Sequence, residues 1–297
     1  FINMKTGKHL EGEAKYWDRF EEQSSRYGIP IWVDYQKADT KEIPFINFST
    51  NPVVDKLYLG KVKDLVIKKA GVGKILDLGC GAGWLSLELA RKGGKVIGID
   101  ISKKRIEIAK KYAKKEGIKI DYLVGDIEDC SWESNNTYDA IINWNSFHHT
   151  KDPQKILASV RKSLKKNGIF ISWDHLGDNF FVKVASKFAS IIPGYYKLKV
   201  KSLGSVHSEG EGIADLRITK EVVSPIMKVT EYKEYFIFVH LIPSLYKFLL
   251  VRMRLPIPIF LLKLILPFLL WLDAILAMVV PDNKNYAFLI AKKIKNG

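Results

Sequence analysis

The chain has 297 residues, of which 47% are hydrophobic and 27% charged, so it can bury a sizeable core and is not a disordered tail. Cys80 and Cys130 are too few for a disulfide-stapled secreted module, and the N-terminus carries no secretory signal pattern, so we expect a cytoplasmic protein. The net charge of +15 indicates either an anionic partner or a lysine-rich surface. Because the lysines are scattered rather than striped, we favour the lysine-rich surface. We do not expect nucleic acid as the partner, because the sequence shows no zinc-spaced Cys/His cluster and no appended RNA-binding signature.

Residues 1–70 are expected to form an N-terminal helical and aromatic cap. The region is polar, with closely spaced tyrosine and tryptophan side chains, and residues 11–25 favour one helix. A stronger helix begins at Asn51-Pro52, with asparagine as N-cap and proline at the first helical position. Its apolar residues recur at helical spacing up to Ala70, which predicts one core-facing side.

From Lys74 onward, strands and helices alternate. The pattern predicts strands over 74–78, 95–99, 118–124, 138–143 and 169–173, and helices over 84–92, 102–117 and 152–165, the last one stopped by Asn167-Gly168. This alternation predicts a parallel sheet wound by right-handed crossovers. Further along, residues 180–192 favour a helix, 193–212 a glycine-punctuated loop, and 226–238 and 286–294 two more strands.

An apolar segment, residues 239–284, precedes the last strand. Within it, residues 255–280 are long enough to cross a bilayer and carry only Lys263 and Asp273 as charged residues. A membrane span is disfavoured because it would leave the last strand on the far side. Three prolines are also expected to break a helix there: Pro256, Pro258 and Pro267. We expect the segment either to lie in an anionic membrane interface or cap an apolar substrate tunnel, or else to be a helical lid or dimer contact.

The strongest chemical signal is the run Ile-Leu-Asp-Leu-Gly-Cys-Gly-Ala-Gly at residues 75–83. A buried strand leads into a turn whose glycines let the backbone approach a ligand, and the next helix points its free N–H groups at that ligand. A dinucleotide site also uses a glycine-rich turn, but Trp84 stands where that fingerprint has its last glycine. The carboxylate of Asp77 suits an ammonium group better than a pyrophosphate.

This run, together with the end of each following strand, resembles the class I S-adenosylmethionine-dependent methyltransferases. The matching elements are the Gly-x-Gly-x-Gly turn, Ile99-Asp100-Ile101 after the second strand, Gly125-Asp126-Ile127 after the third and residues 143–145 after the fourth. The resemblance implies that the turn holds the methionine part of the cofactor, Asp100 the ribose hydroxyls and Asp126 the adenine amine. The implied cofactor-binding residues are Asp77, Gly79, Cys80, Gly81, Gly83, Asp100, Ile101, Asp126, Ile127 and Asn143.

The resemblance also implies the architecture: a Rossmann-like α/β fold with a seven-stranded, mostly parallel sheet, an antiparallel last strand and helices on both faces. We expect a cofactor-binding core over 71–175, a lid loop and sixth strand over 176–238, the apolar insertion over 239–284 and the last strand over 285–297. S-adenosylmethionine is the implied cofactor, its product is S-adenosylhomocysteine, and no metal site is expected.

The acceptor is expected at the carboxyl edge of the sheet, where open α/β sheets place their ligands. His148 and His149 follow the fourth strand and His175 follows the fifth, so these three histidines are the candidate catalytic residues. The leading interpretation is O-methylation of a lipid-linked, isoprenoid or glycan acceptor, with a peripheral membrane location. A soluble small-molecule or sugar methyltransferase is the first alternative, and an RNA methyltransferase or a non-catalytic cofactor-binding protein is a further one.

Overall fold

The structure is a computed structural model that describes residues 12, 14–18, 52–177, 180, 183–184, 187, 217–236, 259–280 and 284–294. The glycine-punctuated loop expected over 193–212 and the first part of the apolar insertion, 239–258, lie outside these residues. Within them, residues 12 and 14–18 are helical, as are 180, 183–184 and 187.

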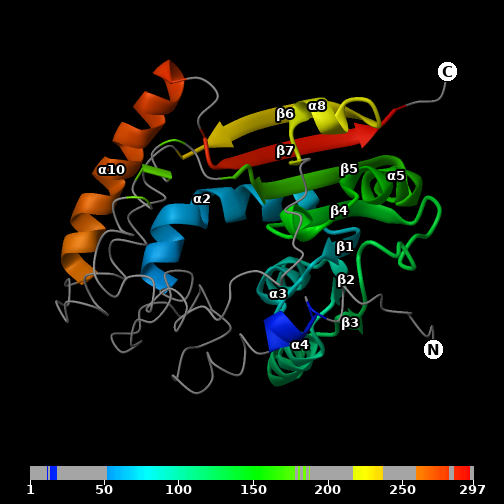
Figure 1. Ribbon diagram of the computed structural model, residues 1–297. Helices are drawn as coiled ribbons and strands as arrows, with labels where there is room; N and C mark the ends of the chain where they lie inside the picture. The colour runs from blue at the N-terminus through cyan, green and yellow to red at the C-terminus, as the bar shows by residue number, and fades with distance from the viewer. Residues whose placement is uncertain are drawn as a thin grey trace.

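The predicted Rossmann-like sheet is confirmed. Seven strands lie in the order β3-β2-β1-β4-β5-β7-β6, and β7 runs antiparallel to both of its neighbours, while the pairs from β3 to β5 are parallel (Figure 1). The strands are β1 (Lys74–Leu78), β2 (Lys95–Asp100), β3 (Asp121–Val124), β4 (Tyr138–Trp144), β5 (Leu164–His175), β6 (Met227–Tyr235) and β7 (Tyr286–Lys293).

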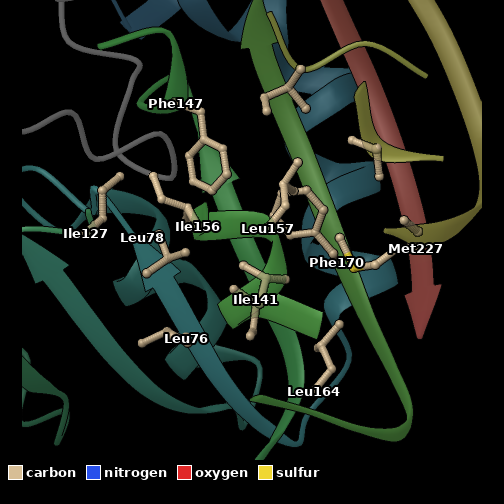
Figure 2. Close-up of a cluster of buried hydrophobic side chains, with 14 of the residues drawn as sticks. Leu76, Leu78, Ile127, Ile141, Phe147, Ile156, Leu157, Leu164, Phe170 and Met227 are labelled. Carbon is tan, nitrogen blue, oxygen red and sulfur yellow. The ribbon is translucent and has the colours of Figure 1, made fainter. Parts of the chain in front are cut away.

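Helices cover both faces of the sheet. One face packs against α2 (Pro52–Ala70), α3 (Trp84–Arg91), α4 (Lys103–Lys115) and α10 (Ile259–Val279). The other face packs against α5 (Pro153–Ser163) and the short α8 (Lys220–Val223), and a 3₁₀ turn η3 (Phe147–His149) follows β4. Figure 2 shows this second core, in which Leu76, Ile141 and Phe170 from three adjacent strands meet Ile156 and Leu157 of α5. Burying these side chains fixes the register of the strands, and therefore which strand ends meet at the site.

Two boundaries differ from the sequence prediction, each for a local reason. The helix expected to reach residue 165 ends at Ser163, and Asn167-Gly168 lies inside β5 rather than stopping the helix. A register shift against β4 absorbs residues 165–168, and a Cβ on Gly168 would lie 2.8 Å from the carbonyl oxygen of Tyr138. The third strand begins at Asp121 rather than at 118, because the N–H of Ile118 still bonds to the last turn of α4.

The expectation that Pro267 breaks the apolar helix is wrong. The helix α10 runs from Ile259 to Val279 with Pro267 inside it. An internal proline removes one backbone hydrogen bond and costs about 3 kcal/mol, which a long helix anchored by packing can absorb. Leu266 beside it is fully buried against the sheet and α2. Over the residues that the structure describes, no helix qualifies by length and hydropathy as a membrane span.

Candidate active site

The glycine turn connects β1 to α3, and its glycines have different tasks. Gly79, Gly81 and Gly83 all have positive φ, of 70°, 56° and 80°. A Cβ on Gly79 would overlap the side chain of Ser146, and one on Gly83 would overlap the Tyr122 hydroxyl, so these two are needed for packing. A Cβ on Gly81 would meet nothing closer than an Arg105 nitrogen at 3.8 Å. Gly81 therefore faces the space where a ligand can approach the backbone.

Two buried carboxylates flank this turn. Asp77, at the end of β1, accepts a hydrogen bond from Ser86 Oγ at 2.6 Å through Oδ2. Its Oδ1 is fully buried and has no hydrogen-bond donor among the described residues. Burial raises the pKa of Asp77 to about 7, with a smaller contribution from the negative charge of Asp100. A buried carboxylate oxygen without a partner among the described residues, beside a glycine turn, is suited to a cationic ligand group.

Asp100, at the end of β2, holds the turn and the next helix in place. Its Oδ2 accepts from the Gly81 N–H at 2.8 Å and its Oδ1 from the Ser102 N–H at 2.9 Å. Burial raises the pKa of Asp100, and the charge of Arg105 acts in the opposite direction. Because each carboxylate oxygen has more than one acceptor position, both oxygens can still accept ligand hydroxyls.

The remaining predicted cofactor residues lie on the same edge of the sheet. Asp126 accepts from the Glu128 N–H at 2.9 Å, and burial raises the pKa of this carboxyl to about 6. Ile127 packs into the core of Figure 2, Ile101 is half-buried, and Cys80 is a buried free thiol whose pKa burial raises. These side chains surround the ends of β1, β2 and β3, but their contacts with a cofactor stay a prediction.

Asn143 bonds to groups at the ends of β4 and β5. It is fully buried, and its Nδ2 donates to Ser172 Oγ at 2.9 Å and to Asp174 Oδ2 at 2.8 Å. Its Oδ1 accepts from Ser146 and from the Phe147 N–H. Asn143 therefore links β4 to the end of β5, and a direct cofactor contact by this side chain stays a prediction.

The three candidate histidines converge, as expected from the shared edge of β4 and β5. The ring centroid of His148 lies 4.0 Å from that of His149 and 5.9 Å from that of His175. His148 Nδ1 lies 2.6 Å from Asp174 Oδ1, and Asp174 is buried to 1% exposure. Asp174 is the neighbour of His175 in the sequence, but its carboxylate lies against the ring of His148.

The His148–Asp174 pair has the electrostatics of a general base. Burial lowers the pKa of His148, although the Asp174 carboxylate acts to raise it, so the ring is neutral at neutral pH. Burial raises the pKa of Asp174, but the positive charge of protonated His148 and hydrogen bonds from His148, Asn143 and the His175 N–H together hold this pKa below its usual value. The ionised carboxylate holds the proton of the neutral ring on Nδ1, which leaves Nε2 as the proton acceptor.

His149 and His175 have other contacts. The Gly177 N–H donates to His175 Nδ1 at 3.2 Å, which places the proton of a neutral His175 ring on Nε2 and makes that atom a donor. His149 lies edge-on to Trp17, with 5.5 Å between ring centroids. His148, with the Asp174 carboxylate 2.6 Å from its Nδ1, has the acidic partner that a general base needs.

The N-terminal residues 14–18 cover this edge of the sheet. Asp18 Oδ1 accepts from Ser102 Oγ at 2.6 Å, and the guanidinium of Arg105 stacks on the Trp17 ring at 3.9 Å. Trp17 thus joins the start of α4, beside Asp100, to His149. These contacts agree with an aromatic cap over the site, while the boundaries of that cap stay a prediction.

Sequence reasoning missed a row of aromatic rings beside the histidines. Trp144 lies edge-on to Trp84 at 5.3 Å and stacks on Trp173 at 5.8 Å, and Trp173 stacks on Tyr286 at 5.1 Å. The His175 ring meets the edge of Tyr286 at 5.1 Å. The sequence signal that could have indicated this row is a tryptophan near the carboxyl end of each of the two strands β4 and β5.

Among the described residues, no group of three or more His, Cys, Asp or Glu side chains is arranged to hold a metal.

Comparisons with known proteins agree with this geometry. Residues 75–168 match the family model described as "Methyltransferase domain". The ubiquinone biosynthesis O-methyltransferase of Pelagibacter ubique (strain HTCC1062) is 45% identical over 96 residues, which are 32% of this chain but only 39% of that protein. The enzyme of the same name from Vibrio atlanticus (strain LGP32) is 31% identical over 180 residues, covering 59% of this chain and 69% of the relative.

Solved structures share the fold at low sequence identity. Geranyl diphosphate C-methyltransferase from Streptomyces coelicolor A3(2) aligns with a TM-score of 0.54 at 12% identity, over 97% of this chain and 99% of that one. The [4+2]-cyclase SpnF aligns with a TM-score of 0.53 at 17% identity, over 98% of each chain. Because one of these chains is named a methyltransferase and the other a cyclase, the shared fold does not fix the reaction.

Proposed function

Because the chain belongs to the class I S-adenosylmethionine-dependent methyltransferases, we propose that it methylates a hydroxyl group on a lipid-linked, isoprenoid or glycan acceptor. The observation that carries the hydroxyl assignment is the His148–Asp174 pair at the carboxyl edge of the sheet. A neutral acceptor hydroxyl becomes a good nucleophile only as its proton leaves, so a general base is the group that this reaction needs.

The residues at the glycine turn fit S-adenosylmethionine. The Oδ1 of Asp77, which has no hydrogen-bond partner among the described residues, supplies a buried oxygen that can hold an ammonium group once the carboxyl is ionised. Gly81 leaves room for close approach to the backbone, and Asp100 has acceptor positions for a ribose diol. Asp126 and Ile127 follow the neighbouring strand and would hold the adenine, as the family resemblance implies.

In the proposed reaction, the bound cofactor supplies a methyl group activated by its positively charged sulfonium. His148 Nε2 would take up the proton that the acceptor hydroxyl gives up during the transfer. The Asp174 carboxylate keeps the His148 ring in the required tautomer and stabilises the imidazolium that forms. Asn143 donates to the second oxygen of Asp174 and so keeps this carboxylate oriented and ionised. General-base assistance of this kind contributes about 10²- to 10⁴-fold to a rate.

The aromatic row supports an acceptor with a flat or apolar body. Trp144 and Tyr286 are half-buried at the edge that carries the histidines, so their rings can pack against such a body while its hydroxyl meets His148. The curated relatives are named ubiquinone biosynthesis O-methyltransferases, which favours a lipid-linked acceptor over a polar metabolite. Such an acceptor resides in a membrane, so the proposal includes a cytoplasmic enzyme with peripheral membrane association.

Transfer of label from methyl-labelled S-adenosylmethionine tests the proposal. Purified protein is incubated with a cell extract, and the products are separated into an organic phase, an acid-precipitable fraction and an aqueous fraction. The expected result is label in the organic phase that disappears with His148→Gln. Label only in the aqueous fraction would indicate a soluble small-molecule or sugar acceptor, and label in precipitated RNA a nucleic-acid acceptor. Cofactor binding without label in any fraction would indicate a non-catalytic protein.

A further inference from the structure

The helix α10 is apolar on two opposite sides. Its inner side packs on α2 and the sheet, where Leu266 is 1% exposed and Asp273, the acidic residue of the helix, is 2% exposed. Its outer side is turned to solvent: Leu264 is 72% exposed and Trp271 is 59% exposed. Together, the exposed apolar residues of the helix are Phe260, Leu264, Ile265, Phe268, Trp271, Met278 and Val279.

Most of these exposed residues follow helical spacing. Positions 260, 264, 268 and 271 recur every three or four residues and therefore form one stripe, which 278 continues two turns later. The rings of Phe268 and Trp271 lie 5.8 Å apart within this stripe. Figure 1 shows α10 at one margin of the molecule, beside α2. Among the described side chains of α10, the outer stripe contains no charge.

We propose that the outer stripe of α10 is a docking surface for an anionic membrane, into which Phe268 and Trp271 insert while the helix lies parallel to the bilayer. A contiguous exposed apolar stripe marks an interaction site rather than ordinary surface, and interfacial helices use Trp, Phe and Leu in this way. The charge of +15 favours approach to an anionic bilayer. The same charge opposes pairing with a second copy of the chain.

The packing of the inner side of α10 also favours a membrane as the partner, because it connects the helix to the candidate acceptor site. Leu269 and Leu270 of α10 pack into the same apolar cluster as Trp144, Trp173 and Tyr286, the aromatic row beside the histidines. The inner side of α10 therefore faces the apolar cluster beside the candidate acceptor site, and the exposed stripe lies on the opposite side of the same helix. An enzyme docked by this stripe would have apolar side chains continuous from the bilayer to the aromatic row.

Vesicle flotation with the 297-residue chain tests the surface without requiring turnover. Wild-type protein is mixed with phosphatidylcholine vesicles, with or without phosphatidylglycerol, and compared with the double variant Phe268→Gln and Trp271→Gln. The matched control is Val72→Gln, because Val72 is 66% exposed but lies in the turn after α2. Binding of S-adenosylhomocysteine verifies that each variant is folded.

We expect wild type and Val72→Gln to float with the anionic vesicles, and the double variant to show a partition coefficient at least roughly tenfold lower. Equal flotation of the double variant and wild type would overturn the proposal, as would wild type that binds neither kind of vesicle. A wild-type dimer in light scattering that becomes monomeric in the double variant would also overturn it and identify a second copy as the partner. These results do not depend on the acceptor, so this inference and the proposed function can fail separately.

Discussion

His148 Nδ1 and Asp174 Oδ1 lie 2.6 Å apart, and this bond joins the end of β5 to the turn that follows β4. The carboxylate is buried and bonded on both oxygens, so it fixes the orientation of the imidazole ring rather than moving with it. The consequence is a ring whose Nε2 is the acceptor, at the edge where parallel α/β sheets bind their ligands.

Replacement of His148 by glutamine should lower kcat by about 10²- to 10⁴-fold and leave the Kd for S-adenosylhomocysteine within about twofold. The reason is that glutamine retains polarity but cannot take the hydroxyl proton. The matched control is His175→Gln, which should cost much less because the Gly177 N–H occupies Nδ1 of that ring. Equal losses of kcat in the two variants would contradict the assignment of His148 as the general base.

The pH dependence of kcat should depend on the same pair, His148 and Asp174. If His148 is the general base, as proposed, turnover requires its neutral form. Burial lowers the pKa of this ring below its usual 6.5, so kcat should be constant near pH 7 and fall as the pH drops through that lowered value. In Asp174→Asn the negative charge that raises the pKa is gone, so the midpoint should move to still lower pH. The plateau should also fall by about a hundredfold or more, because an amide no longer selects one tautomer. A pH–rate profile with an unchanged midpoint in Asp174→Asn would contradict the electrostatic role of this carboxylate.

Cofactor binding should release a proton through Asp77. Burial raises the pKa of this carboxyl from 3.8 to about 7, so the unliganded protein holds a proton there below pH 7. A bound ammonium group favours the ionised form, so binding should release part of a proton at pH 6 to 7, and affinity should increase as the pH rises to about 7. Calorimetry in buffers of different ionisation enthalpy measures the release. The release should be absent in Asp77→Asn, and an unchanged value there would refute the assignment.

The same raised pKa of Asp77 has an effect on folding. The folded protein binds this proton more tightly than the unfolded chain does, so its contribution to stability is present below pH 3.8 and is lost as the pH rises to about 7. Thermal unfolding of the unliganded protein should therefore show a smaller loss of stability between pH 4 and 7 in Asp77→Asn than in wild type.

Alanine substitutions at two glycines should separate backbone strain from ligand contact. Gly81 and Gly117 have similar φ, +56° and +67°, and neither would crowd a neighbour with a Cβ. Each Gly→Ala change should therefore destabilise the fold by about 1–2 kcal/mol, as measured by denaturant unfolding. Only Gly81→Ala should also weaken binding of S-adenosylhomocysteine, because only Gly81 lies in the turn that we propose holds the cofactor. Equal affinities in the two variants would mean that no ligand approaches Gly81.

Local patterns were sufficient to predict most of the fold. The glycine turn, the caps and the alternation of strands and helices depend on neighbouring residues, and the carboxyl ends of β4 and β5 had to share an edge once both were parallel. For this reason the sequence alone was sufficient to predict that His148 and His175 lie close together. The extent of β5 was not, because the register shift that takes up residues 165–168 depends on a contact between Gly168 and the backbone of β4.

The sequence could not predict which side chains contact one another between strands of the sheet. No spacing rule indicates that Asn143 turns to Asp174, or that Trp144 stacks on Trp173, because these contacts depend on strand register and on rotamers in the packed core. The persistence of α10 through Pro267 was missed for a related reason: packing of the inner side outweighs one lost backbone bond. The features that the sequence did not predict all depend on tertiary contacts, whereas the order of the sheet strands along the chain was predicted correctly.

The most direct test of the central claim is the chemical position of the transferred methyl group. Wild-type protein and His148→Gln are incubated with ¹³C-methyl S-adenosylmethionine and a membrane lipid extract, and the organic-phase product is examined by NMR. We expect a methyl group bonded to oxygen, formed by wild type and reduced by about a hundredfold or more in His148→Gln. A methyl group on carbon or nitrogen, or equal product from both proteins, would contradict O-methylation with His148 as the base.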